Sequence, residues 1–143
     1  MIIKDKLLLT MKKIVFFMIA VFALTACHHE TLEERAARES KEYTMKNCPS
    51  AIKNNIRTDS LVFDKNTHAI IYYYTLFNEM DDSLMMANEK EKLIAALKNA
   101  LTKDISLKTY KDAGFNIRYE YHSSTKPELI LLEKTFTPED YSN

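Results

Sequence analysis

The sequence contains very little glycine and no tryptophan: among its 143 residues, Gly114 is the single glycine. Nucleotide-binding loops need several glycines at fixed spacing, because their backbone approaches the phosphates closely. A serine nucleophile elbow of the form Gly-x-Ser-x-Gly also needs more than one glycine. The sequence therefore excludes glycine-rich phosphate loops and this kind of serine hydrolase.

An excess of charge of either sign is also absent. Lysine and arginine together number 20, aspartate and glutamate together number 20, and the formal net charge is zero. Nucleic-acid binding is driven by concentrated positive charge, so we expect no nucleic-acid partner. With 46% apolar and 28% charged residues, the composition is typical of a globular domain.

A long apolar run is missing too, although the N-terminus contains a short one. After Lys12 and Lys13, residues 14–24 form an apolar run that is shorter than the roughly 20 residues of a membrane-spanning helix. A basic start followed by a short apolar run is typical of an export signal. Residues 1–10 fit this pattern badly, which favours Met11 over Met1 as the start of translation.

The segment that follows, Leu24-Thr25-Ala26-Cys27, closely resembles the lipobox of bacterial lipoproteins. The resemblance implies that residues 1–26 are a signal peptide and that Cys27 is acylated, with two or more acyl chains giving a stable membrane anchor. A plain secretory signal that happens to contain a cysteine is the alternative. His28 stands where an aspartate would resemble an inner-membrane retention signal. The outer membrane is therefore the expected location, and the side that the protein faces stays open.

Residues 27–47 are interpreted as a lipidated N-terminus and a charged tether. Their charges allow several pairs at i,i+3 and i,i+4 spacing, and Thr31 with Glu34 resembles a capping box. The sequence predicts a helix near residues 31–46. Its apolar positions are sparse and form a weak stripe: Leu32, Ala36, Ala37 and Tyr43.

Residues 48–143 are expected to form a small α+β domain. Runs of β-branched and aromatic residues predict strands, and a 3.6-residue period predicts a helix. The predicted elements are strands 60–64 and 68–77, a helix over 88–103 with Asn88 or Ser83 as N-cap, and strands 115–123 and 128–136. The order helix, β-β, helix, β-β predicts a four-stranded, mainly antiparallel sheet packed on one helix.

Three consecutive tyrosines, Tyr72 to Tyr74, lie in the strongest predicted strand. Neighbouring strand residues point to opposite faces, so the three rings cannot form one stacking platform. Tyr72 and Tyr74 are predicted to pack across strands with Tyr119 and Tyr121 beneath the helix. Tyr73 and Phe77 share the other face, and if no helix covers it they are the predicted partner-binding residues.

Reactive residues are few and scattered: Cys48, His68 and His122. A cysteine nucleophile needs a base and an orienting group, and none is near Cys48 in the sequence, so a small buried apolar residue is the favoured interpretation. The adjacent His28 and His29 lack the i,i+4 spacing that places two imidazoles on one helix face. We therefore expect no metal and no cofactor.

Two further groups of residues have a structural and a functional interpretation. Met80, Met85 and Met86 are predicted to pad the region before the helix, although methionines also line adaptable binding surfaces. Arg118 and Glu120 alternate on the polar face of a predicted strand and are expected to form an exposed pair of small energetic weight.

The mature part also resembles a group of small exported bacterial proteins and lipoproteins with a CP…YxYxL…YxY layout. The matching residues are Cys48-Pro49, Asp59-Ser60-Leu61, Tyr72-x-Tyr74-x-Leu76 and Tyr119-x-Tyr121. The resemblance spans roughly residues 47–136 and implies no activity. Together with the lipobox, it makes the chain similar to a Bacteroidetes-type lipoprotein. The chain departs from the group at Asn54-Asn55, where an acidic residue is common, and in the last turn, which lacks glycine.

Taken together, these patterns predict a membrane-anchored, non-catalytic binding or scaffolding module of the cell envelope, with an envelope protein as partner. Two alternatives stay open at this point. One is an enzyme whose site is assembled from distant residues, with Cys48, His68 and His122 as the reactive groups. The other is an inhibitor of a secreted enzyme that acts through the hairpin loops.

Overall fold

The computed structural model describes residues 29–142, so Cys27 and the predicted signal peptide lie outside the described residues. All elements belong to one compact unit that begins at Leu32. They are α2 (Leu32–Asn47), β1 (Ile56–Asp64), β2 (Ala69–Leu76), the 3-10 helix η1 (Asn78–Met80), α3 (Ser83–Lys103), α4 (Lys108–Asp112), β3 (Asn116–Ser123), β4 (Ile130–Phe136) and α5 (Pro138–Tyr141). Within residues 29–142, no helix has both the length and the apolar composition needed to cross a membrane.

The four strands form one sheet in the order β1-β2-β3-β4. The pairs β1–β2 and β3–β4 are antiparallel hairpins, whereas the two central strands are parallel, with Tyr72 opposite Tyr119. Parallel pairing follows from the long connection through α3, which returns the chain to the other end of the sheet before β3 begins. The predicted four-stranded, mainly antiparallel sheet is confirmed.

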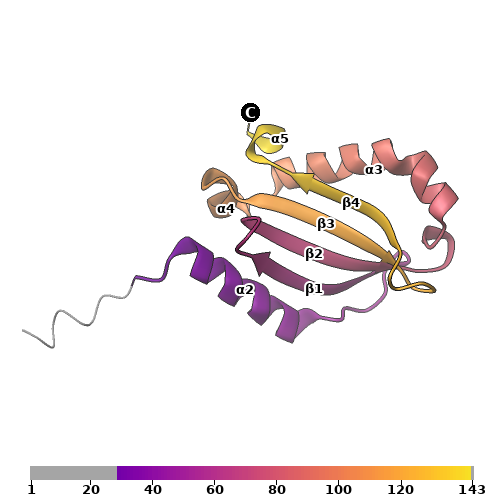
Figure 1. Ribbon diagram of the computed structural model, residues 1–143, viewed down its shortest axis with the longest axis horizontal. Coiled ribbons are helices and arrows are strands. Elements are labelled where there is room, and N and C mark those ends of the chain that lie inside the picture. Colours follow the sequence, from indigo (N-terminus) through magenta and orange to yellow (C-terminus); the bar gives the residue numbers. More distant parts are fainter. Residues whose placement is uncertain (1–28, 143) are drawn as a thin grey trace, which may run out of the picture. The chain divides into compact units, whose positions relative to one another are not determined.

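Both long helices pack on one face of the sheet, which we call the helix face. In Figure 1, α2 runs beside β1 and α3 beside β4. The core contains Ala36 of α2, Leu101 of α3, and Ile70 and Ile117 of the central strands. The prediction that a helix covers the face with Tyr72 and Tyr74 is confirmed, and α2 lies on this same face.

The opposite face of the sheet, which we call the open face, carries no helix within the described part of the chain. Side chains of β2 and β3 alternate between the two faces, and every residue of these strands in the two apolar core clusters belongs to the helix face. The open face therefore holds Ile71, Tyr73 and Thr75 from β2 and Arg118, Glu120 and His122 from β3.

Helix α2 protects the edge of the sheet. The Thr44 hydroxyl donates to the carbonyl oxygen of Leu61 at 2.9 Å and accepts from the Leu61 N–H at 2.8 Å. Leu61 lies in the edge strand β1, whose outward N–H and C=O groups would otherwise be free to pair with another chain. Of the predicted stripe, Ala36 is buried and Tyr43 is 41% exposed.

The helix predicted over 88–103 begins five residues earlier, and the N-cap is neither of the two predicted residues, Asn88 and Ser83, although Ser83 is its direct neighbour. Helix α3 begins at Ser83, and its N-cap is Asp82, whose Oδ1 accepts from the N–H groups of Leu84 and Met85 at 2.8 and 2.9 Å. A further helix that the sequence pattern does not predict, α5, lies in the tail after β4. Thr137 and Asp140 form a capping box there, a pattern that is visible in the sequence.

Candidate functional site

The predicted binding residues Tyr73 and Phe77 lie on the open face, near the end of β2. Tyr73 is half-buried, and its ring centroid lies 6.3 Å from that of His122. Burial is the main cause that raises the pKa of the Tyr73 phenol, and the negative charge of Glu120 is the second. Phe77 follows β2 directly, and the Arg57 guanidinium lies 5.3 Å from its ring centroid. This distance is typical of a cation–π contact, so Arg57 holds the Phe77 ring in place.

A buried carboxylate lies at the centre of the open face. Glu120 is 6% exposed, Arg118 Nη2 donates to its Oε2 at 2.5 Å, and His122 Nε2 lies 2.8 Å from its Oε1. Arg118 also pairs with Glu133 of β4 at 3.0 Å. The prediction of an exposed Arg118–Glu120 pair is wrong, because strands on both sides of β3 and the long side chains of Arg118 and His122 cover Glu120.

A second polar group lies beside the first, between β1 and β2. Arg57 Nε pairs with Asp59 Oδ1 at 2.6 Å, and the Thr75 hydroxyl donates to Asp59 Oδ2 at 2.5 Å. The charged side chains of the open face thus pair with one another, as buried and half-buried charges must. The result is a polar surface in which Tyr73 and Phe77 supply the tyrosine and phenylalanine rings.

The three candidate reactive residues do not form a site. His68 stands just before β2, with Nδ1 at 3.3 Å from Glu33, whereas His122 pairs with Thr75 near the far end of that strand. Cys48 is a free, half-buried thiol. Burial is the main cause that raises its pKa, and the negative charge of Asp59 is the second. An activated cysteine needs a lowered pKa. No catalytic constellation is evident in residues 29–142, and none of their His, Cys, Asp and Glu residues form a metal-binding group.

The tyrosines of the helix face form a packed ladder, as predicted. The ring centroids of Tyr72 and Tyr119 are 5.2 Å apart, those of Tyr74 and Tyr121 are 4.8 Å apart, and both pairs are close to parallel. Burial raises the pKa of all four phenols and brings that of Tyr119 to about 12. The ladder is therefore part of the core, because ring-to-ring packing of this kind stabilises adjacent strands.

An apolar pocket of about 200 Å³ lies between α3 and the end of the sheet, next to Tyr121. Met86 is 2% exposed and belongs to the core, as predicted for padding, whereas Leu84 in the same turn is 71% exposed. Hydrophobic side chains dominate the pocket wall, among them Leu76, Met80, Met86, Leu93, Tyr121 and Leu132.

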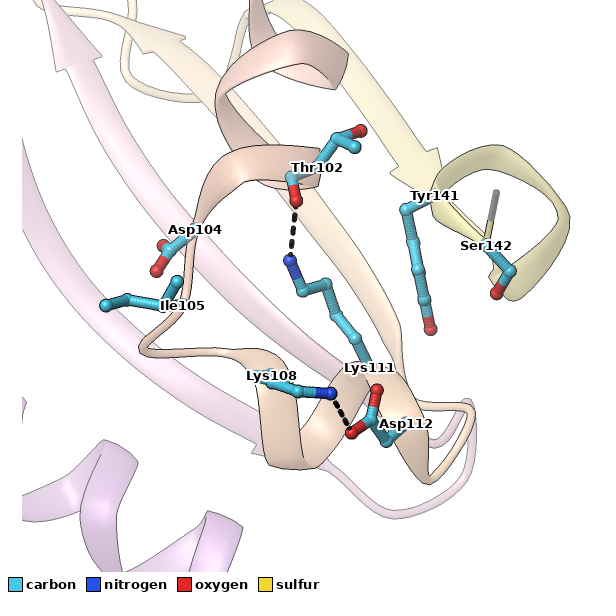
Figure 2. Close-up of a pocket in the computed structure, with 8 residues that line it drawn as sticks. All are labelled: Thr102, Asp104, Ile105, Lys108, Lys111, Asp112, Tyr141 and Ser142. Carbon is cyan, nitrogen blue, oxygen red and sulfur yellow. Dashed lines mark hydrogen bonds and ion pairs between the residues drawn. The ribbon is translucent and has the colours of Figure 1, made fainter.

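A larger polar pocket of about 640 Å³ lies where α3, α4 and α5 meet (Figure 2). Lys111 Nζ donates to the carbonyl oxygens of Leu101 and Thr102 at 2.7 and 3.2 Å, which caps the C-terminus of α3. Lys108 pairs with Asp112 at 2.6 Å. Since both lysines are bonded within the protein, this pocket is a structural junction and offers no free cation to a ligand.

The fold defined by these elements, an α+β domain with two long helices on one face of a four-stranded sheet, is shared with several solved structures. Residues 31–132 match the family model described as Domain of unknown function (DUF8479). The chain belongs to this family. A search of curated proteins gives no match.

Three solved structures resemble the domain at low sequence identity. PA3611 of Pseudomonas aeruginosa, described as a secreted protein, has a TM-score of 0.61 at 10% identity over 78% of this chain and 98% of its own. The type 2 secretion pilotin EpsS of Vibrio vulnificus gives 0.58 at 11% identity over 78% and 93%. The type II secretion pilotin AspS of Vibrio cholerae gives 0.54 at 10% identity over 76% and 91%. At this identity the likeness establishes the fold alone.

Proposed function

We propose that this chain is a lipid-anchored, non-catalytic module of the cell envelope that binds an envelope protein. Cys27 carries the lipid, and the mature chain is held at the outer membrane. The lipobox resemblance supports the anchor. The likeness of the fold to two pilotins of type II secretion systems and to a secreted protein supports an envelope location and a protein partner.

The observation that carries the proposal is that α2 and α3 pack on the same side of the sheet and leave Tyr73 and Phe77 on a face that no helix of residues 29–142 covers. Tyrosine and arginine are enriched among the residues that dominate binding energy at interfaces, and Tyr73, Arg57 and Arg118 supply both types here. We therefore place the partner on the open face, against Tyr73 and Phe77.

The anchor is tested by expressing Cys27→Ser and the matched control Cys48→Ser in the native envelope, with metabolic labelling by an alkyne fatty acid. We expect Cys27→Ser to lose the label and leave the membrane fraction, and Cys48→Ser to keep both. Label that persists in Cys27→Ser would contradict the lipid anchor.

Binding is tested by purifying the natively lipidated protein from detergent-solubilised envelope and quantifying the proteins that accompany it. Tyr73→Ala and Phe77→Ala should each lower recovery of the enriched partner, whereas Ile105→Ala, at a site 86% exposed between α3 and α4, should not. Absence of any enriched protein, or equal recovery with all three variants, would rule out this use of the open face.

A further inference from the structure

Two ionisable side chains bond to the loop between β3 and β4, residues 124–129, at different points. Asp81 Oδ2 accepts from the Ser124 hydroxyl and from the Thr125 N–H, both at 2.9 Å, and His122 Nδ1 lies 2.9 Å from the carbonyl oxygen of Pro127. Hydrogen bonds, that from Ser123 first, lower the pKa of Asp81 to about 2, so its carboxylate stays charged near neutral pH. A histidine ring, in contrast, changes its charge between about pH 5 and about pH 8.

His122 has a hydrogen-bond acceptor at each ring nitrogen. Nδ1 faces the Pro127 carbonyl oxygen, and Nε2 lies 2.8 Å from Glu120 Oε1. The other carboxylate oxygen of Glu120 accepts from Arg118, whose permanent positive charge favours an ionised Glu120. A neutral imidazole has one N–H, whereas its cation has two. Both contacts of His122 can therefore be hydrogen bonds only when the ring is protonated.

The charges around His122 favour the protonated ring. The Tyr73 ring lies 6.3 Å from it, Thr75 is its partner across β2 and β3, and in the loop Lys126 and Glu128 carry opposite charges. The two polar groups of the open face contain two arginines and three carboxylates: Arg57, Arg118, Asp59, Glu120 and Glu133. One negative charge is therefore in excess unless His122 carries a positive charge, and nearby opposite charge stabilises the imidazolium.

We infer that His122 is a proton-controlled latch on the β3–β4 loop. In the protonated ring, Nδ1–H donates to Pro127 and Nε2–H donates to Glu120. When the ring loses one proton, the other stays on Nε2, because a hydrogen bond to a carboxylate is stronger than one to a neutral carbonyl group. The Nδ1 lone pair then faces the Pro127 carbonyl oxygen and this contact is lost, while the bonds of the loop to Asp81 persist.

The latch controls the part of the loop that leads into β4. Leu129 is 38% exposed, and Ile130, which lies opposite His122 in the sheet, is 42% exposed. Loss of the Pro127 contact therefore frees a segment with two exposed apolar side chains at the start of β4. The latch needs no partner, so it is independent of the proposed function.

The first test follows the ring nitrogens of His122 by nitrogen-15 NMR, in the lipidated protein in detergent micelles, between about pH 5 and about pH 8. His122→Gln assigns the His122 signals by their loss. We expect both nitrogens to be protonated at the acidic end and Nε2 alone at the alkaline end. A neutral ring protonated at Nδ1, or a ring whose protonation does not change over this range, would overturn the inference.

The second test measures hydrogen exchange of backbone amides in the same samples, corrected for the intrinsic pH dependence of exchange. The Leu129 N–H donates to the Lys126 carbonyl oxygen at 2.8 Å and closes the turn around Pro127. Its protection should fall by about tenfold as His122 loses its proton, as expected for loss of one hydrogen bond to a charged group. The Thr125 amide, bonded to Asp81 in the same loop, should keep its protection. Constant Leu129 protection while the ring titrates would contradict the latch.

Two glutamine variants show which histidine is responsible. Glutamine at position 122 cannot titrate, so His122→Gln should give the low Leu129 protection at every pH. His68→Gln removes a histidine that pairs with Glu33 instead and should keep the pH dependence of the wild-type chain. If His122→Gln keeps that pH dependence, another group causes it and the inference is wrong. If His122→Gln fails to fold, the ring protonation and amide exchange of the wild-type chain, with His68→Gln as control, still decide the outcome.

Discussion

Replacing Glu120 with glutamine tests whether a buried ionic layer holds the open face together. The Glu120 carboxylate is 6% exposed and contacts Arg118 at 2.5 Å and His122 at 2.8 Å. Glutamine keeps the shape of the side chain and removes its charge. Arg118 then keeps its ion pair with Glu133, so it does not become an unpaired charge.

The expected loss of stability lies between two limits. An exposed ion pair contributes about 0.2–1 kcal/mol, whereas removing one partner of a fully buried pair costs about 3–5 kcal/mol. Glu120 is buried, but the Arg118 side chain is 28% exposed and retains a second carboxylate. We therefore expect Glu120→Gln to lower the free energy of unfolding by about 2 kcal/mol.

Urea unfolding of the unlipidated mature domain measures this loss, with Glu133→Gln as the matched control. The Glu133 side chain is 43% exposed, so its replacement should cost less than about 1 kcal/mol. The slope of the unfolding free energy against urea should be unchanged in both variants. Equal small losses in the two variants would refute the buried ionic layer, because the pair would then behave as an exposed one.

Three further predictions concern the contacts that fix the helices and loops. Thr44→Val removes both hydrogen bonds to Leu61 at the β1 edge and should cost about 1–2 kcal/mol and increase aggregation on heating, followed by light scattering, whereas Thr102→Val at an exposed helix position should do neither. Tyr141→Phe removes the buried bond by which its hydroxyl donates to the Phe115 carbonyl and ties α5 to the start of β3. It should lower the free energy of unfolding by about 1–3 kcal/mol, and an unchanged melting temperature would contradict this role of the bond. Hydrogen bonds from Ser123, Thr125 and Ser124 lower the Asp81 pKa to about 2, so its stabilising effect is present above the unfolded value of about 3.8 and is lost as the pH falls through about 2. Asp81→Asn should therefore flatten the loss of stability between about pH 4 and pH 2 in acid titrations, and an unaltered titration would exclude this role.

The fold class was predictable because strand alternation and helix period are local properties of the sequence. The run from Phe115 to Tyr121 alternates apolar and polar residues, and its apolar members line the helix face as this pattern predicts. The first residues of β1 were missed because Arg57 and Asp59 are polar. Their side chains lie on the open face and pair with each other, a long-range arrangement that a search for apolar alternation does not detect.

The candidate site was less predictable, because it depends on which face each helix covers. The apolar stripe of α2 is too weak to indicate which face of the sheet this helix covers. The position of α2 is fixed by contacts with residues distant in the sequence, such as Thr44 with Leu61 and Glu39 with the Tyr110 hydroxyl. The burial of Glu120 depends on the width of the sheet. A polar residue of an edge strand is exposed, whereas the same residue between two neighbouring strands is covered by their side chains.

The ion pairs of the open face would allow this face to be exposed to water in the free protein and covered by a partner in a complex. Monomeric proteins rarely expose apolar patches larger than a few hundred Å², and here Ile71 is only 4% exposed although no helix of the described residues covers it, because neighbouring long side chains shield it. A partner that covers this face would bury charges that are already paired in the free domain, as Arg118 is with Glu120 and Glu133. Burial of an unpaired charge is the costly event, and the existing pairs avoid it. The binding energy would then come from Tyr73 and Phe77, which is why alanine at these two positions is expected to reduce partner recovery without unfolding the domain.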